Sequence, residues 1–127
     1  MKTVLVIEDN DLNRNLLAAL LKGSYEVLTA KNGAVGLEVL KSRGNDIALI
    51  FLDIQMPVMD GYEFLKAVQE DGTHADIPII VTTIDHTDEE RCLSLGAIDF
   101  VGKPYDPSII KRRADALIRM RDKIAAR

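Results

Sequence analysis

The chain has 127 residues, 47% of them hydrophobic, and a formal net charge of -4. This length suits a single domain with a substantial core, and the mildly acidic charge implies no general affinity for nucleic acid. The single cysteine, Cys92, excludes an internal disulfide, and the apolar runs are too short for a signal peptide or a membrane span, so we expect a cytoplasmic protein.

Strand and helix patterns alternate along the first half of the chain. A strand at 4–7 precedes a helix that carries Leu12, Leu16, Leu17, Leu20 and Leu21, starts at a cap on Asn10 or Asp11, and ends at Gly23. A strand at 25–29 precedes a helix that opens at Asn32-Gly33 and ends near Gly44. The continuous apolar run at 47–52 predicts a strand buried on both faces.

The second half repeats the alternation. We expect a helix from Tyr62 to just before Asp71-Gly72, then a strand opened by Pro78. A short helix begins at Asp88 and Glu89 and is closed by Gly96, a brief strand covers 99–101, and Pro107 opens a last helix. The pattern predicts an α/β fold of type (βα)5, a parallel sheet with helices on both faces. We expect this domain to cover 1–120, with 121–127 a helical extension or the start of a linker to an output domain.

Reactive side chains follow four of the predicted strands. Glu8-Asp9 follows the first, Asp53 the third, Thr82-Thr83 the fourth, and Lys103 the fifth. The carboxyl ends of parallel strands share one edge of a sheet, so these groups should meet there. Three neighbouring carboxylates suit Mg²⁺, while Lys103 and a strand-four hydroxyl could contact a phosphoryl group. The combination indicates formation of an aspartyl-phosphate on Asp53. The sequence has no glycine-rich nucleotide cradle, which indicates a phosphoryl donor held on another molecule.

Over nearly its whole length the chain resembles the receiver domain of bacterial two-component response regulators. The matching pieces are Glu8-Asp9, Asn32-Gly33, the run from Asp53 to Gly61 (DIQMPVMDG), Ile77-Pro78-Ile79-Ile80, Gly96-Ala97 and Lys103-Pro104. The resemblance implies a doubly wound, flavodoxin-like sheet with strand order 2-1-3-4-5. It also implies a partner histidine kinase or phosphotransfer protein as donor, and a cis Lys103-Pro104 bond.

The resemblance further implies the role of each site residue. Asp53 accepts the phosphoryl group, Asp9 and Asp53 bind Mg²⁺, Glu8 acts through water, and Gln55 supplies a backbone carbonyl. Lys103 pairs with the phosphoryl group. A strand-four hydroxyl and Phe100 act as the switch, which reshapes the face of helix four, strand five and helix five for a partner or a second copy. The domain regulates, and catalyses only its own phosphorylation and dephosphorylation.

Some positions depart from the family pattern. Counting forward from Pro78 assigns the switch hydroxyl to Thr83. The segment between these threonines and Gly96 is shorter than is usual in the family, so Thr82 remains an alternative for the same role. Ile84 replaces a small residue and could narrow access to Asp53, and His86 lies in the same shortened loop. Glu8 in place of Asp is a milder change.

Three readings compete with the phosphorylated switch. The first is an interaction module with impaired phosphotransfer, which the bulk of Ile84 and the shortened loop would explain. An aspartyl-nucleophile phosphatase would need an acid two residues after Asp53, where Gln55 stands. A flavodoxin-like cofactor site would need a Ser/Thr/Gly-rich loop, which the sequence lacks.

The positive charge is unevenly distributed, because half of the 16 Lys and Arg residues lie from Lys103 onward. These residues could form a solvated helix face or a docking surface for an acidic partner.

Overall fold

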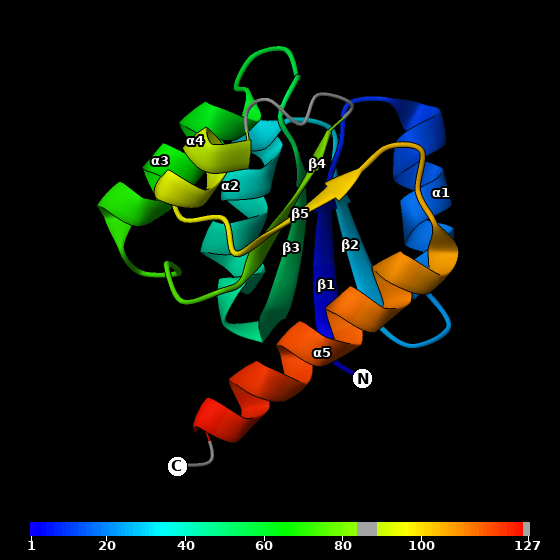
Figure 1. Ribbon diagram of the computed structural model, residues 1–127. Coiled ribbons are helices and arrows are strands. Elements are labelled where there is room, and N and C mark those ends of the chain that lie inside the picture. The colour runs from blue at the N-terminus through cyan, green and yellow to red at the C-terminus, as the bar shows by residue number, and fades with distance from the viewer. Residues whose placement is uncertain (84–88, 126–127) are drawn as a thin grey trace.

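The computed structural model describes residues 1–83 and 89–125. Within these ranges strands and helices alternate in the predicted order (Figure 1). The elements are β1 (Thr3–Ile7), α1 (Asp11–Leu21), β2 (Glu26–Ala30), α2 (Gly33–Arg43), the 3-10 helix η1 (Gly44–Asp46), β3 (Ile47–Asp53), α3 (Gly61–Asp71), β4 (Ile79–Thr83), α4 (Glu89–Ser94), β5 (Asp99–Gly102) and α5 (Pro107–Ala125).

The strands form one parallel sheet in the order β2-β1-β3-β4-β5, which confirms the predicted fold class and strand order. The register aligns the carboxyl ends of the strands. Ile7 lies beside Leu52, Asp53 beside Thr82, and Thr83 beside Gly102. The residues that follow β1, β3, β4 and β5 are therefore delivered to the same edge of the sheet.

Each face of the sheet is covered by helices. Figure 1 shows α2, α3 and α4 on one face and α1 and α5 on the other. Alternate residues of a strand point to opposite faces of the sheet, so each face has its own hydrophobic core. Leu5 and Ile7 of β1 pack with α2 and α3, whereas Val4 and Val6 pack with α1 and α5. This burial on both faces explains why β1, β3 and β4 are buried along their whole length.

Polar caps fix the helices next to the sheet edge. The side chain of Asn10 accepts a hydrogen bond from Asn13 N–H and caps α1, and Asn32 caps α2 in the same way through Val35 N–H. At α3, Asp60 and Glu63 form a reciprocal capping box. The expected starts of the first two helices are thus confirmed, with Asn10 and not Asp11 as the first cap.

The apolar stripe of α1 is only partly used by the core. Leu17 and Leu21, one turn apart, are buried against the sheet, whereas Leu12 is 76% and Leu16 45% exposed. Residues 16 and 17 are about 100° apart around a helix, so both pairs cannot face the sheet. The predicted helix is confirmed, and of its leucines Leu17 and Leu21 are buried, whereas Leu12 and Leu16 are exposed.

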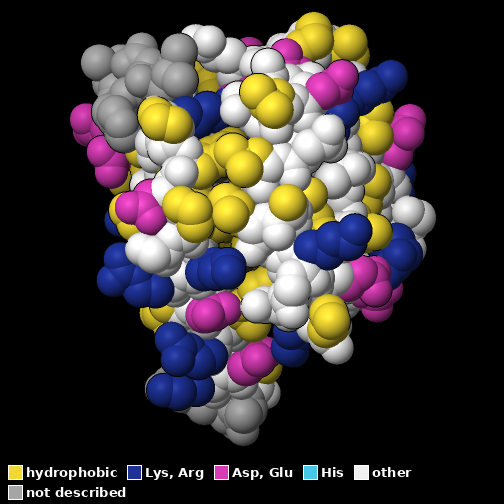
Figure 2. Space-filling view, turned by 90° about the vertical axis from the view of Figure 1, so that its right-hand side faces the viewer, with side chains coloured by type: hydrophobic (Ala, Val, Ile, Leu, Met, Phe, Trp, Pro, Cys, Tyr) yellow, Lys and Arg dark blue, Asp and Glu magenta, His cyan; other side chains and the backbone are white. Residues whose placement is uncertain are grey.

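Helix α5 continues without a break past residue 120, to Ala125. In the part of the helix after residue 120, the Arg121 guanidinium donates to the carbonyl of Ile47 at 3.0 Å and lies 3.4 Å from the Asp76 carboxylate. The predicted division at residue 120 stays a prediction. Lys and Arg side chains gather toward this end of the molecule (Figure 2).

Among the described residues, none of the helices combines the length and the apolar character that a membrane crossing requires. The expectations for Ile84, His86 and a helix start at Asp88 lie outside the described residues.

Candidate functional site

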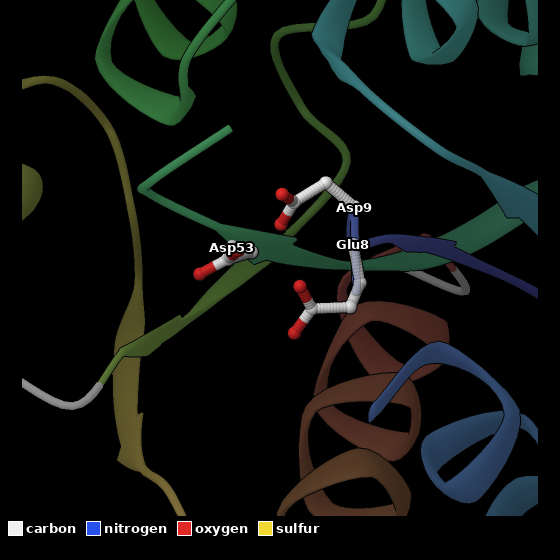
Figure 3. A group of neighbouring side chains, drawn as sticks. All are labelled: Glu8, Asp9 and Asp53. Atoms are coloured by element: carbon white, nitrogen blue, oxygen red, sulfur yellow. The ribbon is translucent and has the colours of Figure 1, made fainter. Parts of the chain in front are cut away.

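The residues predicted from the strand ends meet in one pocket at the carboxyl edge of the sheet. The pocket, of about 260 Å³, is lined by Glu8, Asp9, Asn10, Asn13, Asp53, Gln55, Thr83 and Lys103. Figure 3 shows Glu8 and Asp9 from the end of β1 and Asp53 from the end of β3 facing a common space. Oxygen atoms of the three carboxylates lie within 4.8 Å of one another.

Lys103 bridges two of these acids. Its Nζ lies 2.5 Å from Glu8 Oε1 and 3.1 Å from Asp53 Oδ1. The lysine side chain is 12% exposed, and the side chains of Glu8 and Asp53 are 1% and 6% exposed. A single cation therefore compensates two nearly buried carboxylates, while Asp9 is exposed at the pocket rim. The Lys103-Pro104 bond is cis, as the resemblance implied.

This imbalance of charge perturbs the acids unequally. Burial, and then the hydrogen bond and negative charge of Glu8, raise the pKa of Asp53 to about 7, although Lys103 acts in the opposite direction. Burial alone would raise the pKa of Glu8 too, but hydrogen bonds with Asp53 and Lys103 outweigh it and lower that pKa. Burial opposes the charge of Lys103, but Glu8 and Asp53 raise its pKa. Three carboxylates face one lysine in the pocket, and a divalent cation among them would supply the remaining positive charge.

The loop from β3 to α3 is held tightly over the pocket. Gly61 N–H donates to the carbonyl of Ile54 at 2.8 Å, and Gly33 N–H donates to the carbonyl of Met59 at 3.2 Å. A side chain at Gly61 would place its first carbon 2.6 Å from the carbonyl oxygen of Asp53, so glycine is required there. Val58, at the exposed loop tip, has a φ of 69°, which is strained for a β-branched residue.

Neighbouring threonines at the end of β4 have different surroundings. Thr83 lines the pocket with Asp53 and Lys103. The Thr82 hydroxyl instead hydrogen-bonds the Tyr105 side chain. This placement favours Thr83 as the hydroxyl that could reach a group on Asp53, as counting from Pro78 suggested. Phe100 of β5 is buried in the core on the α2, α3 and α4 face, and its role as a switch stays a prediction.

Sequence reasoning missed three side chains around the acidic pair. The guanidinium of Arg14 donates to the carbonyl of Glu8 at 2.9 Å, and Asn13 lines the pocket. The hydroxyl of Tyr105 lies 3.4 Å from Glu8 Oε1. Asn13 and Arg14, on the first turn of a helix that starts at the acidic pair, could have been suspected. Tyr105 lies 97 residues from Glu8, and nothing in the sequence signals that contact.

Comparisons with known proteins agree on the family. The family model for the response regulator receiver domain matches residues 4–115. The two-component response regulator ORR5 of Oryza sativa subsp. japonica is 34% identical over 119 residues, which are 91% of this chain and 88% of that protein. ORR11 of Oryza sativa subsp. indica is 37% identical over 112 residues, 86% of this chain and 76% of that protein.

Solved structures give the same result. The chemotaxis protein CheY4 of Vibrio cholerae superimposes with a TM-score of 0.84 and 28% identity, over 92% of this chain and 98% of that one. The receiver domain of a signal transduction histidine kinase from Syntrophus aciditrophicus gives a TM-score of 0.84 and 28% identity, over 94% and 91% of the two chains. The chain therefore belongs to the response regulator receiver domains, the phosphorylation-dependent signalling switches of two-component systems.

Proposed function

We propose that Asp53 is the residue of this receiver domain that accepts the phosphoryl group, in a Mg²⁺-dependent reaction with a phosphohistidine of a partner kinase or phosphotransfer protein. A carboxylate oxygen of Asp53 attacks phosphorus, the phosphorus–nitrogen bond breaks, and the imidazole leaves with the electron pair. The observation that carries the proposal is the nearly buried Asp53 carboxylate, in one pocket with Glu8, Asp9 and Lys103. The domain promotes its own phosphorylation and dephosphorylation and is not a turnover enzyme.

The donor set fits Mg²⁺, because three carboxylates with oxygens within 4.8 Å match the oxygen ligands that this ion prefers. Asp9 and Asp53 would bind it directly, Glu8 through water, and Gln55 through its backbone carbonyl. Bound Mg²⁺ supplies positive charge that offsets the repulsion between the carboxylates and an incoming phosphoryl group. The Lys103 ammonium, 3.1 Å from Asp53, provides the second positive charge, and Thr83 donates its hydroxyl to a phosphoryl oxygen.

The phosphoryl donor would dock beside α1. This helix starts directly after the acidic pair, and Asn13 of its first turn lines the pocket. Exposed Leu12 and Leu16, one turn apart, extend an apolar surface from the pocket rim. Figure 2 looks onto the side of the molecule that carries α1 and shows hydrophobic side chains gathered there. A donor protein that presents its histidine to Asp53 would cover this surface.

The output surface would be the face of α4, β5 and α5, which changes when Thr83 and Phe100 respond to the phosphoryl group. On α5 this face carries a shallow pocket lined by Ile109, Arg112, Arg113 and Ala116. Acidic Glu89 and Glu90 begin α4, so two copies could pair acidic and basic patches across a homodimer. Residues 1–120 would form the cytoplasmic switch, with 121–127 extending α5 toward an output domain and no direct contact with nucleic acid or membrane.

The test is phosphorylation by a small acyl phosphate with Mg²⁺, followed by intact mass. Wild-type protein should gain one phosphoryl group that alkali removes, and Asp53→Asn should gain none. Asp60→Asn is the matched control, because Asp60 lies in the same loop but caps α3 through Glu63 N–H. Failure of the wild type to label at any donor concentration would refute the proposal and favour an interaction module with impaired phosphotransfer.

A further inference from the structure

Besides its hydrogen bond with Asp53, the almost completely buried Glu8 carboxylate has three donors near it. Lys103 Nζ donates to Oε1 at 2.5 Å, the Asn10 N–H donates to Oε2 at 3.2 Å, and the Tyr105 hydroxyl lies 3.4 Å from Oε1. The strongest of these donors is shared, because the same ammonium lies 3.1 Å from Asp53 Oδ1. The surroundings of Glu8 therefore depend on the charge carried by Asp53.

Phosphorylation of Asp53, on which this inference rests, would change that balance. A phosphoryl group adds further negative charge and three acceptor oxygens at Asp53, and these attract Lys103. Any movement of the ammonium toward the new group lengthens its contact with Glu8 Oε1. A buried carboxylate that loses a donor is costly unless another donor replaces it. At Oε1 the other recorded donor among the described residues is Tyr105.

Tyr105 is well placed to supply that donor. It follows the Lys103-Pro104 bond and packs on the α1 and α5 side of the sheet. Its burial raises its pKa to about 12, so the hydroxyl keeps its proton at physiological pH. The Tyr105 side chain also hydrogen-bonds Thr82. In its contact with Glu8, the Tyr105 hydroxyl is the donor and Oε1 is the acceptor.

We propose that Tyr105, oriented by Thr82, is a positioning residue that holds the Glu8 carboxylate in the Mg²⁺ site and replaces Lys103 when that lysine turns to the phosphoryl group. This assigns the two neighbouring threonines separate tasks: Thr83 faces the phosphoryl group, and Thr82 orients the side chain that secures Glu8. Such an outer contact fixes the orientation of a group that acts on the metal through water.

The experiment compares Tyr105→Phe, Thr82→Val and the double variant with wild type. Tyr25→Phe is the matched control, since it also removes a tyrosine hydroxyl bonded to an acid, here Asp115, remote from the pocket. Mg²⁺ affinity is measured on the unphosphorylated proteins by NMR titration, and the rate of labelling by a small acyl phosphate at saturating Mg²⁺ by intact mass. Both Phe variants keep the ring and its packing, so folding should be preserved.

Tyr105→Phe should weaken Mg²⁺ affinity by about tenfold, at the low end for a contact outside the ligand shell. It should also slow labelling, Thr82→Val should do both to a lesser extent, and Tyr25→Phe should do neither. The double variant should be no worse than Tyr105→Phe, because the two hydroxyls act in series. Wild-type behaviour of Tyr105→Phe, or additive losses in the double variant, would overturn the inference. A wild type that binds Mg²⁺ but never labels would refute the proposed function instead, while the affinity arm still tests Tyr105.

Discussion

Replacing Asp53 by Asn should stabilise the metal-free protein at alkaline pH. The Asp53 side chain is 6% exposed, lies beside Glu8, and shares one lysine with it. Its pKa rises from the ordinary 3.8 to about 7 on folding, so between these values the folded protein holds a proton that the unfolded chain has lost. Stability from this group is therefore fully present below pH 3.8 and is lost as the pH rises through about 7. Above that pH the ionised carboxylate opposes folding.

The size of the effect follows from the same values. Each tenfold change in an ionisation constant is worth about 1.4 kcal/mol, so the rise from 3.8 to about 7 corresponds to about 4 kcal/mol. Part of this cost belongs to Glu8, because the two acids share the interaction. The amide of Asp53→Asn carries no charge yet keeps an oxygen for Lys103. We therefore expect a gain in the free energy of unfolding of about 2–4 kcal/mol at pH 8.

Urea unfolding from pH 5 to pH 8 without divalent cations measures this directly. Wild-type stability should fall across the range relative to Asp53→Asn, and millimolar Mg²⁺ should restore much of it in the wild type alone. Asp122→Asn is the control, because its exposed pair with Lys2 should contribute less than about 1 kcal/mol. Equal stability of wild type and Asp53→Asn at pH 8 would refute the reasoning that Asp53 is held under electrostatic strain.

Three further substitutions test the loop and the docking surface. Val58→Asn should raise the free energy of unfolding by about 1 kcal/mol in urea titrations, because Val58 is strained at a φ of 69° and Asn tolerates that region; a loss would contradict this. Gly61→Ala should cost about 1–3 kcal/mol and slow labelling, since a methyl carbon 2.6 Å from the Asp53 carbonyl forces the loop to shift; unchanged unfolding and labelling would exclude that shift. Leu12→Ser should slow transfer from the partner kinase but not from a small acyl phosphate, and equal slowing with both donors would argue against docking on α1.

The fold was predictable because its determinants are local. Asn10, Asn32 and Asp60 belong to the residue types that are favoured as helix N-caps, and the apolar run of β3 is continuous because both its faces are covered. The exposure of Leu12 and Leu16 was not predictable from periodicity, since the leucines of α1 cover a wider part of the helix surface than the part that contacts the sheet. Which leucines are buried depends on how the helix lies on the sheet.

The acidic pocket was predictable in its members but not in its connections. Parallel strands deliver Asp9, Asp53, Thr83 and Lys103 to one edge whatever the loops contain. That Lys103 sits closer to Glu8 than to Asp53 depends on side-chain packing across the sheet edge. Strand register determines that Thr83 lines the pocket, while Thr82 contacts Tyr105, whose own contact with Glu8 spans 97 residues of sequence. The contact of Arg14 with the carbonyl of Glu8 likewise appears only in three dimensions.

The most direct test of the central claim is to locate the phosphoryl group within the chain. Protein labelled with a small acyl phosphate and Mg²⁺ is treated with borohydride, which reduces an acyl phosphate to a stable alcohol, and is then digested and sequenced by mass spectrometry. The account predicts reduction at Asp53 and at no other carboxylate. Reduction at Glu8 or Asp9, or a phosphoryl group found on a hydroxyl side chain, would contradict it.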